Sequence, residues 1–320
     1  MIEHLIAITI AFLLDLWLGD PRWLPHPVRM IGSLIHFLEK RWNKGKFRRF
    51  KGIVMVIIVC SLVSAIAWLV TLLGYHVHVV LGIVIESYFI WTTIALKGLK
   101  EASMDVYTPL IESDYAVARQ QLSMIVGRDT AHLGESEMTR GTVETVAENT
   151  SDGITAPLIF ALLGGAPLAM LYRAVNTCDS MVGYRHERYY YFGWASARLD
   201  DVLNWIPARL TALLLLLLEQ TPYQTKKEAF ILLFSHSKRH PSPNSGWGEA
   251  AFALLLGIQL GGENRYFGEV SIRPTIGIAY EEMNAEHIKA AHHLMTRATL
   301  YVMTFLWIGG VAIEMASTWS

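Results

Sequence analysis

The chain has 320 residues, of which 52% are hydrophobic and only 17% are charged, and its mean hydropathy is +0.33. Charged residues usually supply about 25% of a soluble domain, so this composition excludes an ordinary soluble enzyme. The 27 basic and 28 acidic residues nearly balance, which leaves no overall positive field for binding nucleic acid. Two cysteines, Cys60 and Cys178, are too few for a disulfide framework or a zinc site, and we expect both to be reduced.

Apolar segments at both ends of the chain predict membrane spans. Residues 52–74 carry no charge, and residues 77–96 and 300–316 are each interrupted by one glutamate. A helix needs about 20 apolar residues to cross a bilayer, so residues 52–74 fit best. Residues 2–18 are shorter and contain Asp15. Because they lack a basic leader and a cleavage site, we expect a retained first membrane segment.

Basic residues predict the orientation of these spans. Nine of them lie between residues 19 and 51, namely Arg22, Arg29, Lys40, Arg41, Lys44, Lys46, Arg48, Arg49 and Lys51. The turn at Tyr75 and His76 has none, and Lys97 and Lys100 follow the next apolar segment. Loops rich in Lys and Arg face the cytoplasm. We therefore expect the N-terminus outside, a basic cytoplasmic loop, a membrane hairpin, and a return to the cytoplasm near Lys97.

The middle of the chain is apolar but irregular. Residues 154–171 are broken by glycine and proline at 163–167, and residues 210–218 are too short to cross alone. Two ordinary crossings would place residues 173–202 outside, together with Arg173, Arg185, Arg188 and Arg198, against the charge rule. We therefore expect re-entrant or partly immersed helices that line a cytoplasm-facing cavity, with two ordinary crossings as the alternative.

These patterns predict an all-α, polytopic membrane protein with a single membrane-embedded domain. Residues 1–96 would form the N-terminal membrane helices and basic loop, residues 97–209 a polar catalytic block, residues 210–297 a helical segment with a basic turn, and residues 298–320 the last membrane helix. Residues 97–140 have the mixed charges of soluble helix, and residues 115–126 have the apolar spacing of a surface helix.

Glu144, Glu148 and Asp152 are spaced by four residues, so on a helix they form one acidic stripe. Magnesium is usually held by one or two carboxylates together with substrate phosphates. The alternative is a solvated helix face. Because the stripe adjoins an apolar segment, we favour a metal-binding or catalytic site.

Two further clusters repeat this chemistry. Asn176 and Asp179 are three residues apart, and Asp200 and Asp201 precede Asn204, so each pair lies on one helical face. They could share a metal and phosphate site with the acidic stripe. The alternative is a set of helix caps and interhelical hydrogen bonds.

Arginines and one basic turn provide the opposite charge. Arg140, Arg173, Arg198 and Arg209 lie in or next to the polar block. A guanidinium binds phosphate or carboxylate through two hydrogen bonds, although these side chains could also pair with the acidic residues.

The segment Lys238-Arg239-His240 precedes an apolar helix at 250–260, which predicts an anion site at a helix start. The alternative is a surface loop near lipid headgroups.

Other polar residues lie near the first span. His26 and Arg29 begin the basic loop, and we expect a polar partner for Asp15, such as Arg29. The aromatic residues Trp42, Tyr189, Tyr190 and Tyr191 fit an interfacial belt better than a cofactor stack.

Long motifs in a fixed order give the chain a strong resemblance to the CbiB/CobD family of adenosylcobinamide-phosphate synthases. The motifs are Asp15-Leu-Trp-Leu-Gly-Asp-Pro21, Leu24-Pro-His-Pro-Val-Arg29, the block at 140–209 that begins Arg-Gly-Thr-Val-Glu-Thr-Val-Ala-Glu-Asn-Thr-Ser-Asp-Gly, and Ser237-Lys-Arg-His-Pro-Ser-Pro-Asn-Ser-Gly-Trp-Gly-Glu249. The resemblance implies an ATP-driven amide ligation between adenosylcobyric acid and (R)-1-aminopropan-2-ol O-phosphate or a related amino-alcohol phosphate. No glycine-rich nucleotide motif is present, so the use of ATP rests on the resemblance.

The implied chemistry assigns roles to the clusters. Catalytic roles fall to Glu144, Glu148, Asp179 and Asp201, and metal binding, expected to be of Mg²⁺, to Glu148, Asp152, Asp179, Asp200 and Asp201. Binding of substrate or phosphate falls to Arg140, Arg173, Arg198, Asn176, Lys238, Arg239, His26 and Arg29. The resemblance also implies a corrinoid substrate, a multi-pass protein of a bacterial or archaeal inner membrane with its active site facing the cytoplasm, and contacts with other membrane proteins of cobalamin assembly.

Two other functions remain open from the sequence. One is an AmpE-like membrane signalling protein, against which the dense motifs at 140–209 and 238–249 argue. The other is an intramembrane prenyltransferase or a transporter, because asparagine and aspartate clusters facing a membrane cavity would suit either.

Overall fold

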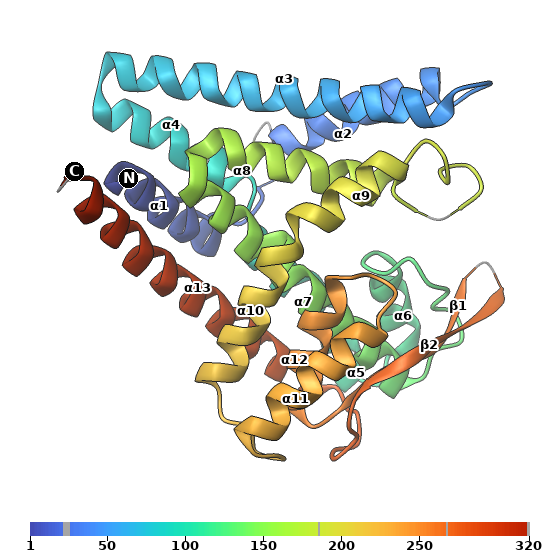
Figure 1. Ribbon diagram of the computed structural model, residues 1–320. Helices are drawn as coiled ribbons and strands as arrows, with labels where there is room; N and C mark the ends of the chain where they lie inside the picture. The colour runs from blue at the N-terminus through green and yellow to red at the C-terminus, as the bar shows by residue number, and fades with distance from the viewer. Residues whose placement is uncertain (22–25, 185, 267, 319–320) are drawn as a thin grey trace. The chain divides into compact units, whose positions relative to one another are not determined.

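The computed structural model describes residues 1–21, 26–184, 186–266 and 268–318, and it is mostly helical (Figure 1). The elements are α1 (Ile2–Leu18), α2 (Pro27–Trp42), α3 (Arg48–Val77), α4 (Val79–Trp91), α5 (Leu96–Ile111), α6 (Tyr115–Ser123), α7 (Glu135–Thr150), a π-helical turn η1 (Ser151–Thr155), α8 (Ala156–Val182), α9 (Trp194–Leu203), α10 (Trp205–Leu218), α11 (Lys226–His236), a 3₁₀ turn η2 (Ser237–Arg239), α12 (Ser245–Leu256), β1 (Gln259–Tyr266), β2 (Glu269–Gly277) and α13 (Glu286–Thr318). Arg22, Leu24, Pro25 and Arg185 of the sequence motifs and charge patterns lie outside the described residues.

Within the described residues, four helical stretches are long and apolar enough to cross a membrane. They are Arg48–Val77, Val79–Ile111, Glu135–Val182 and Glu286–Ala316, and α9 with α10 would make a fifth if they form one broken span. Two of them contain the segments predicted at 52–74 and 300–316, and Val79–Ile111 contains all but the first two residues of the segment predicted at 77–96. The first predicted segment forms α1, whose 17 residues place it at the short end of the range for a crossing. A multi-pass membrane protein is therefore supported by length and composition.

The chain divides into two compact units, each assembled from segments that are distant in sequence. Unit 1 contains Met1–Ala95, Ala156–Asn204 and Met303–Ser320, and unit 2 contains Leu96–Thr155 and Trp205–Val302. The single membrane-embedded domain stays a prediction.

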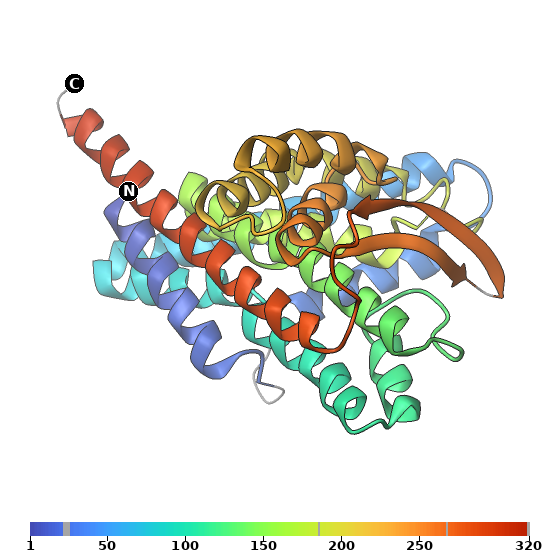
Figure 2. The same ribbon diagram turned by 90° about the horizontal axis from the view of Figure 1, so that it is seen from below.

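Unit 1 is built around α3, which packs against α2, α4, α8 and α9 (Figure 1). Its core contains Ile35, Met55, Val59, Val175 and Phe192. Both views show α1 beside the C-terminal half of α13 (Figures 1 and 2), where the indole nitrogen of Trp307 donates a 3.0 Å hydrogen bond to Thr9.

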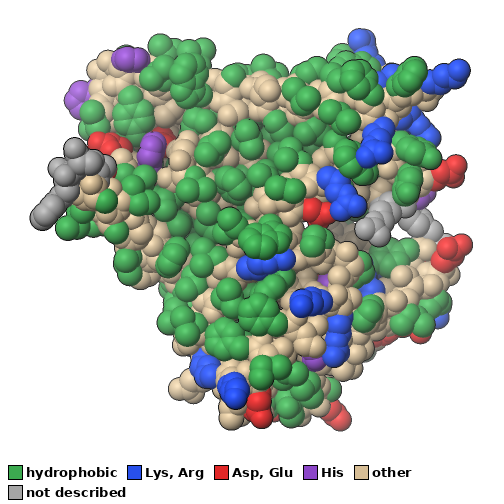
Figure 3. All heavy atoms as spheres, viewed as in Figure 1, with side chains coloured by type: hydrophobic (Ala, Val, Ile, Leu, Met, Phe, Trp, Pro, Cys, Tyr) green, Lys and Arg blue, Asp and Glu red, His purple; other side chains and the backbone are tan. Residues whose placement is uncertain are grey.

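The surface of unit 1 has the character expected of a membrane segment. Large apolar side chains of α3 remain exposed, among them Leu62, Trp68 and Leu73 at 46%, 56% and 55%. Figure 3 shows hydrophobic side chains along α3 and basic side chains gathered at its end. A row of exposed apolar side chains along a whole helix marks contact with a membrane or a partner.

The break predicted in residues 154–171 is confirmed. Helix α8 is interrupted at Gly164 and Gly165, and Gly165 has a φ of 62°, a conformation that glycine adopts without steric cost. Glu86 of α4, which is fully buried, accepts the N–H of Ala166 at 3.2 Å. It also contacts Tyr75 at 2.5 Å and His4 at 2.7 Å. The charge inside an apolar segment therefore satisfies the backbone of a broken helix.

Unit 2 is centred on α12, which packs against α7, α10 and α11. Nearly every residue of α12 is buried, including Trp247 and Phe252. Gly248 makes the close approach to α7: a side-chain carbon there would lie 2.6 Å from the carbonyl oxygen of Ala147.

The hairpin of β1 and β2 in unit 2 corrects one expectation (Figure 1). The sequence predicts a helical segment over residues 210–297, but Gln259–Tyr266 and Glu269–Gly277 form an antiparallel pair with an irregular register between Leu260 and Gly262. Gly261 and Gly262 both have positive φ values, 81° and 86°, which interrupt a helix and allow a bulge. The fold is therefore mostly helical rather than all-α.

The predicted orientation can be tested by labelling single cysteines introduced into an otherwise cysteine-free protein. Both native cysteines are buried. From the charge rule, we expect reagents to reach residues 46, 136, 190 and 242 from the cytoplasm and residue 76 from outside. Labelling of residue 190 from outside would contradict the re-entrant arrangement and restore two ordinary crossings.

Candidate functional site

The predicted site residues fall into two polar clusters, one in each unit. Unit 2 holds Arg140, Glu144, Glu148, Asp152, Arg209, Lys238 and Arg239, and unit 1 holds His26, Arg29, Arg173, Asn176, Asp179, Arg198, Asp200 and Asp201. Each cluster is described by itself.

Helix α7 supplies the centre of the unit 2 cluster. Glu144 and Glu148 are spaced by four residues on this helix, so they share one face, as predicted, and Arg140 lies one turn before them on the same face. Asp152 lies in the π-helical turn that follows. Such turns are frequent at functional sites.

Glu144 holds together three segments of unit 2. Its side chain forms a buried ion pair with Arg128, and its other oxygen accepts the N–H of Gly261 at 2.8 Å. Arg128 also donates to the side-chain oxygen of Asn264 at 2.5 Å. A charge this well buried needs such a partner, so Glu144 joins the loop before α7 to strand β1.

Arg140 is likewise hydrogen-bonded to the backbone of strand β1. Its terminal nitrogens donate to the carbonyl oxygen of Gly261 and to that of Glu263 at 2.6 Å. In this arrangement the guanidinium positions β1, and its phosphate-binding role stays a prediction.

Glu148 meets the start of α12. One carboxylate oxygen accepts a 2.7 Å hydrogen bond from the Ser245 hydroxyl. This side chain is half-buried, so Glu148 is more accessible than Glu144 and better suited to contact a ligand.

A buried pair, His240 and Glu249, lies beside these carboxylates. His240 Nε2 is 3.5 Å from Glu249 Oε1 and 3.5 Å from a guanidinium nitrogen of Arg273. Burial raises the pKa of Glu249 well above its usual value, and the nearby Glu144 and Glu148 raise it further. Burial also lowers the pKa of His240. The pair therefore favours a neutral imidazole next to a protonated carboxyl group.

The basic turn at residues 238–240 exposes its charged side chains to the surface. Lys238 and Arg239 in η2 are exposed, and Arg239 donates to the carbonyl oxygen of Thr275 at 3.1 Å. Turn η2 is followed after five residues by α12, which confirms a basic turn before an apolar helix, although the helix spans Ser245–Leu256 rather than residues 250–260. Arg209 contacts the N-cap residue of α12, Asn244, at 3.2 Å.

The unit 1 cluster is a hydrogen-bonded chain between α8 and α9. Asp200 accepts hydrogen bonds from Asn176 at 3.3 Å and from Asn204 at 2.9 Å. Asn204 in turn accepts one from the hydroxyl of Tyr172 at 2.7 Å, and Arg173 donates to Asn176 at 3.4 Å. Both carboxylate oxygens of Asp200 thus bind side-chain amides, which supports the interhelical alternative for this residue.

Asp179 and Asp201 lie at the edge of this series of hydrogen-bonded side chains between α8 and α9. Asp201 is partly exposed and lies 3.8 Å from Arg198. The Asp179 carboxylate lies against Gly183, where a side-chain carbon would come within 1.8 Å of it. The remaining predicted residues, His26 and Arg29, contact Asp20 at 3.1 Å and the carbonyl oxygen of Pro21 at 3.5 Å.

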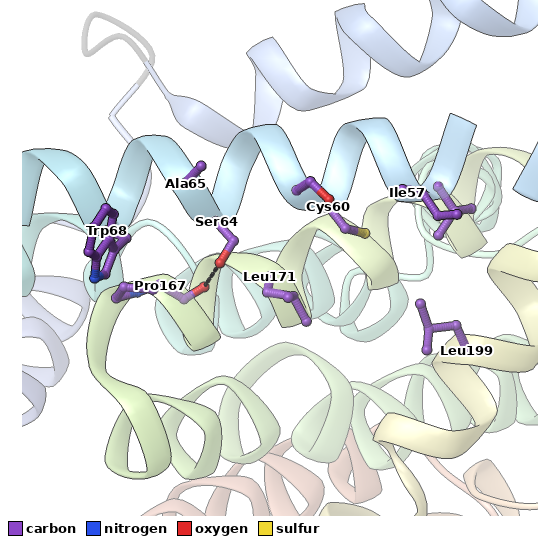
Figure 4. Close-up of a pocket in the computed structure, with 10 residues that line it drawn as sticks. Ile57, Cys60, Ser64, Ala65, Trp68, Pro167, Leu171 and Leu199 are labelled. Carbon is purple, nitrogen blue, oxygen red and sulfur yellow. Dashed lines mark hydrogen bonds between the residues drawn. The ribbon is translucent and has the colours of Figure 1, made fainter. Parts of the chain in front are cut away.

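An apolar groove in unit 1 lies between α3, α8 and α9 (Figure 4). Its polar groups are few, and Ser64 donates to the carbonyl oxygen of Pro167 at 3.3 Å. No charged side chain lines it, so this groove has no group for acid–base or phosphoryl chemistry.

Sequence patterns had not assigned several of these residues to the site. Arg128 comes from the loop before α7, Asn264 and Arg273 come from β1 and β2, and Tyr172 had not been separated from the apolar residues around it. Among the described residues, no three His, Cys, Asp or Glu side chains form a group that could hold a metal. The metal-ligand assignment stays a prediction.

Replacing Gly248 by Ala tests the packing of α12 on α7. The added carbon would press on Ala147, and overpacking costs about 1–3 kcal/mol, so we expect a lower free energy of unfolding in detergent. Gly98→Ala is the control, because nothing lies within 4 Å of that position. Equal stability of the two variants would contradict the described packing.

Comparison with known proteins places the chain in a family. The model of the CobD/Cbib protein family matches residues 8–295. The chain is 53% identical to a cobalamin biosynthesis protein CobD of Halalkalibacterium halodurans, over 96% of this chain and 97% of the relative. It is 47% identical to a CobD of Geobacter metallireducens, over 92% and 93%, and 45% identical to a cobalamin biosynthesis protein CbiB of Salmonella typhimurium, over 94% and 96%. No solved structure matches the chain. The chain therefore belongs to the CobD/CbiB family.

Proposed function

We propose that this protein is an adenosylcobinamide-phosphate synthase. It joins a carboxylate of adenosylcobyric acid to the amine of (R)-1-aminopropan-2-ol O-phosphate, or of a related amino-alcohol phosphate, at the expense of ATP. The relatives' names support a role in cobalamin biosynthesis. The observation that carries the proposal is the charged cluster of unit 2, where Glu148 and the pair of His240 and Glu249 lie beside an exposed basic turn.

A carboxylate is a poor acyl donor, so the reaction needs activation. A carboxylate oxygen attacks the terminal phosphorus of ATP, which gives an acyl phosphate and ADP. The amine then attacks the acyl carbon, the carbon–oxygen bond to phosphate breaks, and phosphate leaves with one former carboxylate oxygen. Cationic side chains stabilise the charge that develops on the transferred group.

The amine must lose a proton before it attacks. A neutral imidazole is a suitable acceptor near pH 7, and burial lowers the pKa of His240, which favours the neutral form of its ring. Three side chains are therefore candidate bases, namely Glu148, Asp179 and His240, and Glu249 lies 3.5 Å from the His240 ring.

Magnesium fits the available carboxylates. The ion usually takes one or two carboxylates and completes its shell with phosphates and water, so it does not require a preassembled group of three protein ligands. Asp179 and Asp201, which both border the segment between α8 and α9, have this donor chemistry. When bound, the ion would neutralise phosphate charge.

The test is an assay of ADP formation by the purified protein. We expect continuous ADP formation only when adenosylcobyric acid and the amino-alcohol phosphate are both present, with one ADP formed for each amide. Continuous ADP release when one of the two substrates is missing would contradict the proposal, and so would amide formation without ATP. An AmpE-like protein, a prenyltransferase or a transporter would form no amide.

Lys238 is proposed to bind the phosphate of the amine substrate, because it is exposed on the basic turn. We expect Lys238→Ala to raise the apparent KM for the amine phosphate about 10-fold or more and to change that for adenosylcobyric acid little. Lys227→Ala, an exposed lysine on α11, is the control. A defect that falls on ATP instead would assign the turn to the nucleotide.

A further inference from the structure

A polar cavity of about 540 Å³ lies within unit 1 between the start of α3 and the segment that joins α8 to α9. Aromatic, basic and acidic side chains line it, including Arg49, Tyr184, Tyr190, Trp194, Arg198 and Asp201. Small-ligand sites usually enclose roughly 300–1,000 Å³. The volume therefore suits a molecule the size of a nucleotide, whereas a corrinoid is too large to be enclosed.

We propose that this cavity binds the nucleotide that donates the phosphoryl group, together with its divalent cation. This inference rests on the proposed function and adds a location for ATP, which the sequence motifs do not provide.

The aromatic side chains offer faces for a planar base. Tyr184 and Tyr190 are 58% and 60% exposed, and Tyr190 meets Tyr191 edge to face at 5.1 Å. A base stacked on an aromatic ring is stabilised by about 1–3 kcal/mol regardless of its identity. This stacking would explain nucleotide binding without a glycine-rich loop.

Two arginines are placed to contact phosphates. The guanidinium of Arg49 stacks on Trp194 at 3.7 Å, and its N–H groups form no hydrogen bond with the residues that the structure describes. Stacking fixes the plane of a guanidinium and leaves its edge free for phosphate oxygens. Arg198 is 65% exposed and only loosely paired with Asp201, so it could turn toward a phosphate.

The acidic side chains explain why the ligand would bring a cation. Asp201 lines the cavity, and the carboxylate of Asp179 lies against Gly183, another lining residue. Carboxylates repel a bare phosphate but bind Mg²⁺ that is already coordinated by phosphates. The hydrogen bond from Asn176 to Asp200 ties α8 to α9 and fixes the spacing of these two carboxylates.

Lipid headgroups are the competing ligand, since aromatic and basic residues also gather where a membrane meets water. A headgroup shares the phosphate chemistry of a nucleotide, but it needs neither a base-stacking face nor a divalent cation. The two carboxylates at the cavity therefore favour the nucleotide.

The test measures binding of radiolabelled adenosine 5′-O-(3-thiotriphosphate) with Mg²⁺ to the full-length protein in phosphatidylcholine nanodiscs, with and without adenosylcobyric acid. We expect Arg49→Gln and Trp194→Leu each to raise the dissociation constant at least about 10-fold. Arg41→Gln is the matched control, because Arg41 stacks on Phe37 at 4.5 Å outside the cavity. Trp68→Leu, an exposed tryptophan of α3, controls for loss of an indole. Both controls should stay within about 2-fold of wild type.

The outcomes separate this proposal from the proposed function. Unchanged nucleotide affinity in both cavity variants, with ATP-dependent ligation intact in the wild type, would overturn the cavity assignment alone. A wild type that binds nucleotide through the cavity but forms no amide would overturn the ligase instead. If phosphatidylglycerol nanodiscs weaken binding of the nucleotide to wild type and the cavity variants lose only this lipid sensitivity, the ligand is a headgroup and the nucleotide assignment is wrong.

Discussion

Replacing Asp201 by Asn, Asp179 by Asn or Glu148 by Gln is expected to lower the rate of amide formation at least about 100-fold, a loss as large as that from removing one group that stabilises the transition state. These changes preserve shape and remove the charge that would bind Mg²⁺ or accept a proton. Asp201 lines a polar cavity and Glu148 is half-buried, so both can reach a ligand.

Turnover at limiting Mg²⁺ is the measurement, and Asp105→Asn on the exposed face of α5 is the control. Loss of activity that higher Mg²⁺ partly restores would identify a metal ligand. If all three variants keep near wild-type turnover at limiting Mg²⁺, the carboxylates are structural and the site assignment is wrong.

Glu144→Gln is expected to act mainly on stability. The side chains of Glu144 and Arg128 are 6% and 7% exposed, and breaking a buried ion pair from one side costs about 3–5 kcal/mol because the other charge is left uncompensated. We therefore expect a large fall in the free energy of unfolding in detergent, and a similar fall for Arg128→Met.

A double-mutant cycle checks this explanation. The double variant should lose less than the sum of the two single losses, since each single change already removes the pair. A Glu144→Gln variant that unfolds like wild type but forms no amide would instead give Glu144 a direct catalytic role.

Local patterns in the sequence predicted much of unit 1 and the helical part of the site. A 17-residue apolar segment gave α1, and two adjacent glycines marked the break in α8. The spacing of four placed Glu144 and Glu148 on one face of α7. These features depend on the geometry of residues a few positions apart in one helix, so the local sequence predicts them.

Long-range pairing could not be predicted in the same way. The spacing of Glu144 gave no sign of Arg128 or of the Gly261 N–H, and nothing local joined His240 to Arg273. The hairpin was missed because a glycine-rich start and alternating residues such as Val270 and Ile272 lie between two helical segments. Such contacts form only when distant segments fold together, so the sequence of one chain does not specify them locally.

The most direct test of the proposed ligation, in which ATP activates the carboxylate as an acyl phosphate, follows the oxygen of that carboxylate. Adenosylcobyric acid labelled with ¹⁸O in its free carboxylate is incubated with the protein, ATP, Mg²⁺ and the amino-alcohol phosphate, and the phosphate products are analysed by mass spectrometry. Ligation through an acyl phosphate predicts one ¹⁸O in inorganic phosphate for each amide formed. Label in AMP, or amide formation without transfer of label to any phosphate product, would contradict the account.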